Sequence, residues 1–329
     1  MIYIPNNAHD PALNLAQEEF LLCNANLKED VLFFYINRPS IIIGKHQNTE
    51  EEIDRDYVKE HSIPVVRRLS GGGAVYHDFG DLNFSFIHPN DHDAATADFS
   101  EFTAPIVNAL NELGVPVTLG GRNDLLLDGM KVSGCAYYHN LHGSVCHGTL
   151  LFDTDLDALG KALLPKPGKS ENKGVLSVPS RVCNLKPYLK GIETAEALRD
   201  AILKIIGGLV SLDVKELKAE DLALCEDIAN LRYRREDWNY GKSPAYNFRK
   251  TVKQPSGTID FRADIRDGKV HSARFFGDFF CVGNIRFLEM GLEDADWTKE
   301  AVEAALIEYS WSKYFPEYFL DDFLKVLFD

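Results

Sequence analysis

Hydrophobic residues in the N-terminal part of the chain recur first with helical spacing and then in short runs. Residues 11–25 place apolar side chains three and four positions apart, which predicts a helix with Asp10 as its N-cap and Pro11 in its first turn. The apolar runs 31–36 and 40–44 flank a turn-like Asn-Arg-Pro-Ser sequence, so we expect two buried strands. Residues 50–61 are strongly charged and predict a surface helix.

The pattern then changes to alternation, which favours strands. Residues 63–70 and 74–86 predict strands on either side of a triple glycine, and 100–113 predict a helix. Residues 115–152 have the pattern of three or four strands, in which Asp128-Gly129 is the strongest hairpin signal.

The rest of the chain predicts a division into two domains. Residues 166–186 are rich in Pro, Gly, Ser and Lys and predict a long irregular segment, before helices at 195–210 and 216–234. Residues 241–257 have the composition of a linker, and an alternating hairpin over 258–279 is followed by helices. We therefore expect a large domain over 1–244 and a small α+β domain over 245–329.

Composition narrows the class of protein. The chain has 329 residues, 45% of them hydrophobic, and a net charge of −15, which disfavours non-specific binding to nucleic acid or to anionic membranes. Its apolar runs are too short for a membrane helix, and its first residues do not resemble a secretory signal. Six scattered cysteines without a C-x-x-C motif are typical of a reduced, cytoplasmic protein. Size and composition favour an enzyme.

The first candidate for chemistry is the sequence Arg-Arg-Leu-Ser-Gly-Gly-Gly-Ala-Val-Tyr-His over residues 67–77. Consecutive glycines let backbone N–H groups approach an anion, and strand alternation would put Arg68 and Ser70 on one face, beside the same ligand. A Walker A loop is excluded because no Gly-Lys-Ser/Thr follows, and a dinucleotide fingerprint is excluded because a strand follows. An ordinary glycine-rich hairpin remains the alternative.

The second candidate is the hairpin over residues 121–136, in which Lys131 follows the Asp-Gly turn. The residues after Lys131 are apolar or small, so we expect the lysine to have little local charge to pair with. A solvated lysine is the alternative to a functional one. His147 opens another strand, where a hydrogen-bonded core histidine is the common role.

Taken together, these motifs resemble the lipoate–protein ligases, within the biotin/lipoyl ligase family. The resemblance rests on residues 67–86, Gly-Arg-Asn-Asp-Leu at 121–125, Asp-Gly-Met-Lys-Val-Ser-Gly at 128–134, His-Gly-Thr-Leu at 147–150 and Ser-Arg-Val-Cys-Asn-Leu at 180–185. It runs from Asn14 to about Asn247 in order, and the tail also looks like the ligase branch. It implies an α/β (α+β) fold: a catalytic domain of mixed sheets flanked by helices, related to biotin ligases and class II synthetases, with a small C-terminal α+β domain.

The resemblance also implies the reaction. Lipoate and Mg-ATP give lipoyl-AMP and pyrophosphate, and a lysine of an apo-lipoyl domain then displaces AMP. The implied acceptors are lipoyl domains of 2-oxoacid dehydrogenase E2 subunits or the glycine-cleavage H protein. ATP with Mg and lipoate enter as substrates, and no tightly bound prosthetic group is expected.

Residue roles are carried over by motif. Lys131 is the expected catalytic residue, which contacts the acyl carboxyl and the α-phosphate, and Asp124 is the expected magnesium ligand. We expect Lys131 to meet the glycine loop across one small cavity. The expected residues around ATP and lipoyl-AMP are Arg68, Ser70, Gly71, Gly72, Gly73, Ala74, Val75, Tyr76, His77, Asn123, Asp124, Lys131, Gly134, Ala136, His147 and Thr149.

Three positions depart from the family pattern. Tyr138 stands where some relatives have arginine, Cys146 replaces the first histidine of a His-His-Gly-Thr motif, and Asp81 stands where asparagine is common. These departures bear on ligand contacts and acyl preference more than on the type of reaction. Because the acceptor domains are often acidic, we also expect a local basic patch around Lys45, Arg67 and Arg181.

Three other functions compete with ligation. An ATP-independent octanoyl or lipoyl transferase would need a cysteine nucleophile, for which Cys135, Cys146 and Cys183 are the candidates. A non-catalytic binder of lipoyl domains and a biotin ligase are the others.

Overall fold

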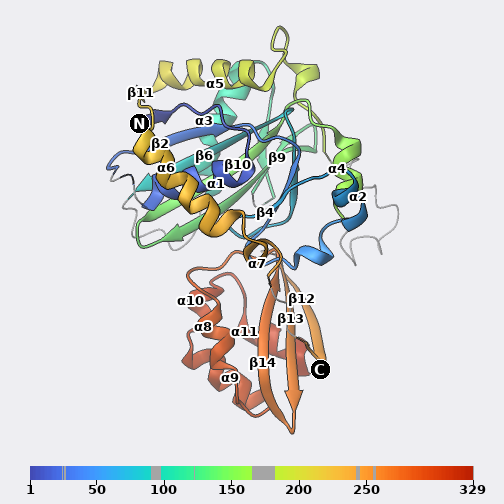
Figure 1. Cartoon of the computed structure of the whole chain (residues 1–329). Coiled ribbons are helices and arrows are strands. Elements are labelled where there is room, and N and C mark those ends of the chain that lie inside the picture. Colours follow the sequence, from blue (N-terminus) through green and yellow to red (C-terminus); the bar gives the residue numbers. More distant parts are fainter. Residues whose placement is uncertain are drawn as a thin grey trace. The chain divides into compact units, whose positions relative to one another are not determined.

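The computed structural model describes residues 1–23, 25, 27–89, 98–121, 123–164, 182–241, 245–254 and 257–328. Contacts within this part of the chain group it into two compact units (Figure 1). The first comprises Met1–Ile43, Thr49–Arg68 and Ala74–Asn239, and the C-terminal unit comprises Gly44–Asn48, Leu69–Gly73 and Tyr240–Asp329. The sequence pattern did not indicate that two short N-terminal segments group with the C-terminal unit. Most of the predicted irregular segment lies outside the described residues.

A mixed sheet forms the centre of the first unit (Figure 1). Its order among the described residues is β11-β1-β2-β6-β10-β9-β8-β7. The strands β6 to β10 pair antiparallel, whereas β1 pairs parallel with both of its neighbours. This large sheet confirms the predicted strands over 115–152. Its strands are β1 (Ile2–Ile4), β2 (Val31–Tyr35), β6 (Asp81–Pro89), β7 (Thr118–Gly120), β8 (Asp124–Leu127), β9 (Met130–Asn140), β10 (Gly143–Leu151) and β11 (Asp213–Val214).

Helices cover the large sheet. Helix α1 (Pro11–Cys23) packs on β2, β6 and β10, and its Leu21 and Leu22 join Phe33, Tyr35 and Val145 in one apolar cluster. Helices α3 (Phe99–Glu112) and α5 (Ala195–Leu209) pack on each other, and α5 also contacts β6 (Figure 1). The helical predictions for these segments are confirmed.

A smaller sheet in the same unit consists of β3 (Ser40–Ile43), β4 (Val65–Arg67) and β5 (Val75–His77), in the order β4-β3-β5 within the described chain. Strands β2 and β3, which follow each other in sequence, therefore belong to different sheets. The predicted single strand over 74–86 is wrong for the same reason: β5 lies in the small sheet and β6 in the large one.

The corner between β5 and β6 is built by two carboxylates. Gly80 N–H donates to Asp78 Oδ1, and Asp78 N–H donates to Asp81 Oδ2. A Cβ at Gly80 would lie 2.2 Å from the Asp153 carbonyl oxygen, so only glycine fits this turn. Thr154 Oγ1 donates to Asp81 Oδ1 at 2.8 Å, and Asp81 is completely buried.

The predicted helix over 50–61 is wrong as a continuous element. A 3-10 turn over Thr49–Glu51 is followed by α2 (Arg55–Glu60). Ile53 interrupts them because it forms a β-bridge with Leu163. Asp54 then starts α2 as its N-cap, since its side chain accepts a hydrogen bond from Tyr57 N–H.

The predicted helix over 216–234 also differs in detail. Helix α6 (Ala219–Ile228) continues into a π-helix over Ala229–Tyr233 and is followed by α7 (Glu236–Asn239). A short helix, α4 (Leu156–Ala162), completes the elements of the first unit that bear on the site.

The C-terminal unit contains an antiparallel sheet, ordered β12-β13-β14 within the described residues. The linker prediction is wrong for Phe248–Gln254, which form β12, an edge strand with one buried residue, Val252. The predicted hairpin and terminal helices are confirmed. They are β13 (Gly257–Arg266), β14 (Lys269–Gly277), α8 (Arg286–Gly291), α9 (Lys299–Glu308), α10 (Trp311–Tyr314) and α11 (Leu320–Phe328). Their core is rich in aromatic side chains.

Among helices in the described part of the chain, none is long and apolar enough to cross a membrane.

Arg67 fastens several segments of the first unit together. Its Nη2 donates to Thr49 Oγ1 at 2.6 Å and to the Asn239 carbonyl at 2.9 Å, and its Nε donates to the Trp238 carbonyl. Trp238 Nε1 donates back to the Arg67 carbonyl. Arg67 is 7% exposed, so the predicted basic surface patch around it is wrong. Arg181, another member of that patch, lies outside the described residues.

We predict that Arg67→Ala destabilises the protein, because several buried acceptors would lose their donor. A loss of about 3 kcal/mol is the usual cost of such a change. It corresponds to a fall in Tm of roughly 6 °C or more, measurable by circular dichroism. The control Arg55→Ala removes a guanidinium whose side chain is 70% exposed and paired with Glu50, and Tm should stay within about 1 °C. Equal Tm values for the two variants would contradict this role.

We predict that Asp81→Asn stabilises the protein, increasingly so as the pH rises. Burial raises the pKa of Asp81 well above its usual value, and the nearby Asp78 carboxylate adds to the effect. A raised folded pKa means that stability is fully present below the unfolded value of about 3.9 and is lost as pH rises through the folded pKa. Asparagine does not titrate, so the difference in Tm between variant and wild type should grow between pH 5 and pH 8. A constant difference would contradict the assignment.

Candidate active site

The register of the large sheet brings several predicted site residues onto one face. Asp124 pairs with Gly134, Gly134 with Thr149, and Thr149 with Asn83 on adjacent strands β8, β9, β10 and β6. Two residues further along, Ala136 pairs with His147, and His147 with Ser85. Residues directly opposite each other, and residues two apart, share a face of a sheet. Helix α1 lies on this face, because its Glu18 contacts His147 and Ser85.

Lys131 and Asp124 form an ion pair at the edge of this face. Lys131 Nζ lies 2.8 Å from Asp124 Oδ1, and the two side chains are 37% and 35% exposed. The prediction that Lys131 lacks a local charge to pair with is therefore wrong. Gly134 makes room for the pair, since a Cβ there would lie 2.7 Å from Lys131 Nζ. The Lys131 side chain therefore passes over Gly134, which pairs with Thr149 on the neighbouring strand β10.

Two further contacts hold this hairpin in place. Asn123 donates from Nδ2 to the Cys135 carbonyl, and its own carbonyl accepts from Cys135 N–H at 2.8 Å. Val182 forms a parallel bridge with Lys131, and Cys183 N–H donates to the Lys131 carbonyl at 3.0 Å. The end of the Ser-Arg-Val-Cys-Asn-Leu motif therefore braces the backbone of Lys131. Arg122, Ser180 and Arg181 lie outside the described residues.

His147 contacts the carboxylate of Glu18, a buried residue that the sequence analysis did not identify. Its Nδ1 lies 2.9 Å from Glu18 Oε1, and Ser85 Oγ donates to Glu18 Oε2 at 2.5 Å. Glu18 and His147 are each 6% exposed. The sequence contained a signal for this contact, because Glu18 lies within a predicted helix, close in sequence to the apolar residues Leu15, Leu21 and Leu22 that face the core. A carboxylate in such a position needs a buried partner.

Arg68 supplies a buried positive charge. It is 6% exposed, its Nη1 donates to the Ile42 carbonyl at 3.2 Å, and its backbone N–H donates to the Ile43 carbonyl. Burial lowers the pKa of Arg68 to about 10, while the neighbouring Tyr35 and Glu18 oppose that shift. The guanidinium therefore remains charged at neutral pH and has Glu18 as its nearby anion.

His77 connects the small sheet to the large one. Its Nδ1 lies 2.9 Å from Asn37 Nδ2 and its Nε2 lies 3.1 Å from Thr149 Oγ1. Burial lowers the pKa of His77 to about 3, with smaller contributions from Arg68 and His147, so the imidazole is neutral at physiological pH. Both ring nitrogens bond to the protein.

The glycine loop groups with the C-terminal unit. The Ser70 carbonyl accepts from Lys45 N–H at 2.8 Å, and a Cβ at Gly71 would lie 2.3 Å from the Phe279 carbonyl oxygen. Gly72 has a φ of 88°, which favours glycine, and it packs against Gly44. Ala74 to His77 belong to the first unit, mostly in β5. The meeting of Lys131 with the glycine loop, and a ligand shared by Arg68 and Ser70, stay predictions.

The cysteines proposed as nucleophiles lie in unfavourable places. Cys135 and Cys146 are 3% and 0% exposed, and burial raises the pKa of Cys135 to about 12 and holds that of Cys146 well above its usual value. Burial also raises the pKa of the half-buried Cys183. Thiolates are the reactive form, so these thiols are poor nucleophiles at neutral pH.

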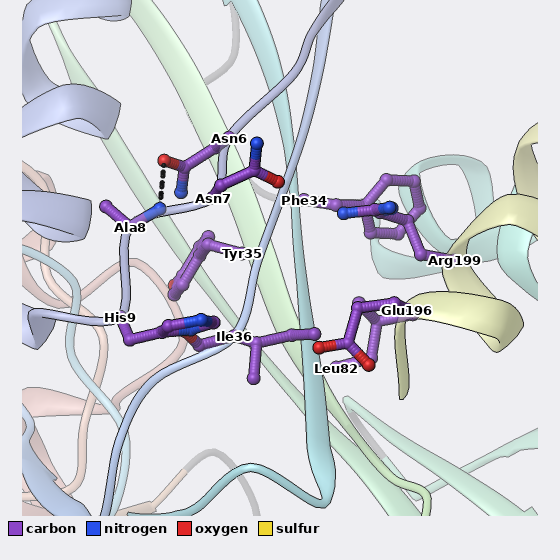
Figure 2. Close-up of a pocket in the computed structure, with 10 residues that line it drawn as sticks. All are labelled: Asn6, Asn7, Ala8, His9, Phe34, Tyr35, Ile36, Leu82, Glu196 and Arg199. Atoms are coloured by element: carbon purple, nitrogen blue, oxygen red, sulfur yellow. Dashed lines mark hydrogen bonds between the residues drawn. The ribbon is translucent and has the colours of Figure 1, made fainter. Parts of the chain in front are cut away.

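A pocket of about 70 Å³ lies in the first unit. Asn6, Tyr35, Glu196 and Arg199 are among the residues that line it (Figure 2). Cavities that hold drug-sized ligands measure roughly 300–1,000 Å³. This pocket is too small for a nucleotide, and none of the predicted site residues lines it.

Two family models match the chain. The lipoyl protein ligase A/B catalytic domain matches residues 10–207, and the bacterial lipoate protein ligase C-terminus matches residues 243–327.

Full-length relatives agree with both models. The chain is 44% identical to lipoate–protein ligase 1 of Staphylococcus aureus over 94% of each chain, and 40% identical to lipoate–protein ligase LplJ of Bacillus subtilis over 100% of each.

Solved structures share the fold. LipL1 of P. falciparum, solved in complex with lipoate, has a TM-score of 0.78 at 24% identity and covers 98% of this chain and 97% of its own. A lipoate–protein ligase A bound with ATP has a TM-score of 0.64 at 28% identity, with coverage of 73% and 98%. A bipartite ligase of Thermoplasma acidophilum, studied with its E2 lipoyl domain, has the same TM-score and identity, with coverage of 75% and 98%. The family models, the relatives and the fold agree: the chain belongs to the lipoate–protein ligase family.

Proposed function

We propose that this protein is an ATP-dependent lipoate–protein ligase that activates lipoate as lipoyl-AMP and transfers the lipoyl group to a lysine of apo-lipoyl domains. The observation that carries the proposal is the partly exposed Lys131–Asp124 pair, which lies over Gly134 in register with Thr149. A partly exposed lysine held by one carboxylate is poised to exchange that partner for a substrate anion.

In the first step a carboxylate oxygen of lipoate attacks the α-phosphorus of ATP, and the bond to pyrophosphate breaks. Two anions must approach each other, and preorganised cations lower the cost of doing so. Lys131 supplies an ammonium that reaches both the carboxylate and the α-phosphate, and Arg68 supplies a second positive charge from the interior. The glycine loop, Ser70 to Tyr76, would donate backbone N–H groups to the nucleotide.

Magnesium accompanies ATP in this proposal, and Asp124 fits the ion. Magnesium is usually held by one or two carboxylates together with substrate phosphates and water. The Asp124 carboxylate is 35% exposed, and Lys131 neutralises it when no substrate is bound. Binding of Mg-ATP would release Asp124 to the ion and Lys131 to the phosphate.

In the second step the acceptor lysine attacks the acyl carbon of lipoyl-AMP, an amide bond forms and AMP leaves. The free amine has a pKa of about 10.4, so it must lose a proton before or during the attack. His77 is an unsuitable base, because both of its ring nitrogens are engaged by the protein.

The relatives support lipoyl domains as the class of acceptor. A ligase bound with ATP and a ligase studied with its E2 lipoyl domain both share this fold above 25% identity. We infer that the acceptors are lipoyl domains of 2-oxoacid dehydrogenase E2 subunits or the glycine-cleavage H protein. We place the reaction in the cytoplasm, in keeping with the free thiols. The raised pKa values of the buried cysteines disfavour the transferase alternative.

We predict that Lys131→Ala abolishes lipoyl-AMP formation, with a loss of about 10³-fold or more, because a cation at the reacting centre contributes several kcal/mol. Release of pyrophosphate from lipoate and Mg-ATP measures this step, and mass spectrometry of an apo-lipoyl domain measures transfer. Tm should change little, since the side chain is half exposed. A variant with full pyrophosphate release would remove Lys131 from the mechanism.

We predict that Gly134→Ala displaces the Lys131 ammonium without unfolding the protein. The new Cβ would meet the flexible end of the lysine, which can move away from Asp124. Adenylation should fall about tenfold, equivalent to about 1.4 kcal/mol. Gly208→Ala is the matched control, because a Cβ there meets nothing within 4 Å in a helix. Equal adenylation by the two variants would argue against the role of Gly134.

A further inference from the structure

A continuous hydrogen-bonded path of buried side-chain amides leads to His77 and Thr149. Asn14, Asn37 and Asn83 are 0%, 0% and 1% exposed, and neither the motifs nor the reaction assigns them a role. Polar groups buried this deeply must satisfy one another. Together with Asn6, His77 and Thr149 they form what we call the amide relay, which lies entirely in the first unit.

Backbone groups fix the direction of the relay at its N-terminal end. Ala8 N–H donates to Asn6 Oδ1 at 3.0 Å, the bond drawn dashed in Figure 2, so Asn6 turns its Nδ2 toward Asn14. Asn14 Nδ2 donates to the Ala8 carbonyl and, at 2.8 Å, to Asn37 Oδ1. Asn37 therefore presents its Nδ2 to His77 Nδ1, which has to accept.

The other end of the relay imposes the same state on the imidazole. Asn83 Nδ2 donates to the Tyr35 carbonyl, so its Oδ1 accepts from Thr149 Oγ1 at 2.9 Å. This bond uses the one hydroxyl proton of Thr149, which must then accept from His77 Nε2. Both ends require a neutral His77 with its proton on Nε2.

We propose that Asn37 is a positioning residue of the lipoyl-binding site: through His77 it orients the Thr149 hydroxyl so that only a lone pair is left for a ligand. The proposal rests on the proposed function. Carboxylate and phosphate oxygens are acceptors, so Thr149 cannot donate a hydrogen bond to them. They would bind instead to the Lys131 ammonium, which lies over Gly134, the residue that pairs with Thr149. The charged and titratable groups near His77 are Arg68 and His147, the latter paired with Glu18.

The tautomer can be measured in the full-length wild-type protein. In protein labelled with ¹⁵N-histidine, NMR correlations should show His77 as a neutral imidazole protonated at Nε2 from pH 8 to about pH 5, below the ordinary histidine pKa of about 6.5. The His77→Gln variant identifies its signals. A proton on Nδ1, or titration near pH 6.5, would overturn the relay.

Asn37→Asp tests the effect on the site. The carboxylate has the same size but only accepts, so His77 Nδ1 would have to carry a proton. In the neutral ring Nε2 then becomes an acceptor, and the single Thr149 proton cannot serve both Nε2 and Asn83 Oδ1. The Thr149 side chain would therefore be displaced from one of them, which disturbs the wall of the lipoyl-binding site. We expect His77 to gain a proton on Nδ1, and the KM for lipoic acid in pyrophosphate release to rise about tenfold while kcat changes less than about threefold. The control Asn111→Asp makes the same chemical change at an exposed amide that bonds to the Val107 and Val117 carbonyls, and should leave the KM unchanged.

The outcomes separate the relay from the proposed function. A wild-type protein that releases no pyrophosphate with lipoic acid would refute the proposed function, while the NMR spectrum would still decide the His77 tautomer. An active wild type together with an Asn37→Asp variant of unchanged KM and tautomer would refute the positioning role alone. Should Asn37→Asp fail to fold, the wild-type spectrum remains decisive.

Discussion

The burial of charge between two sheets is the constraint on which the first unit depends. Arg68 and Glu18 are each 6% exposed. A buried charge is tolerated only when partners replace the water it has lost. Here Glu18 accepts from Ser85 and contacts His147, Arg68 bonds to a backbone carbonyl, and His77 stays neutral beside the guanidinium. The positions of these side chains are therefore fixed before any substrate binds.

This arrangement divides the work between the interior and the edge. The interior supplies fixed dipoles and one fixed charge, whereas Lys131 and Asp124 lie at the rim and retain about a third of their exposure. Groups that must exchange partners during a reaction benefit from exposure to solvent and substrate. Groups that orient the substrate benefit from rigid positions. The sheet register joins the two sets, because Gly134 under the lysine lies opposite Thr149 of the interior.

The sequence predicted the fold class, most elements and the family, but not several features that arise from tertiary contacts. Local periodicity identified α1 and the hairpin around Asp128-Gly129, where short-range physics decides the structure. It could not show that β2 and β3 enter different sheets, because both are simply short apolar runs. Strand β12 was missed because its pattern is largely polar, as edge strands allow. For the candidate site, motif residues such as Lys131 were found, whereas Glu18 and Asn37 were not, since their importance comes from partners far away in the chain.

The charged character of β12 has a consequence for the behaviour of the protein in concentrated solution. An edge strand presents backbone groups to which a strand of another molecule could add, which is a common route to aggregation. Lys250 and Lys253 place positive charges along this edge, whereas the Arg249 guanidinium is paired with Asp260. A second copy that approached edge to edge would bring the same charges, so electrostatic repulsion opposes self-association at this strand while leaving the fold of the sheet undisturbed.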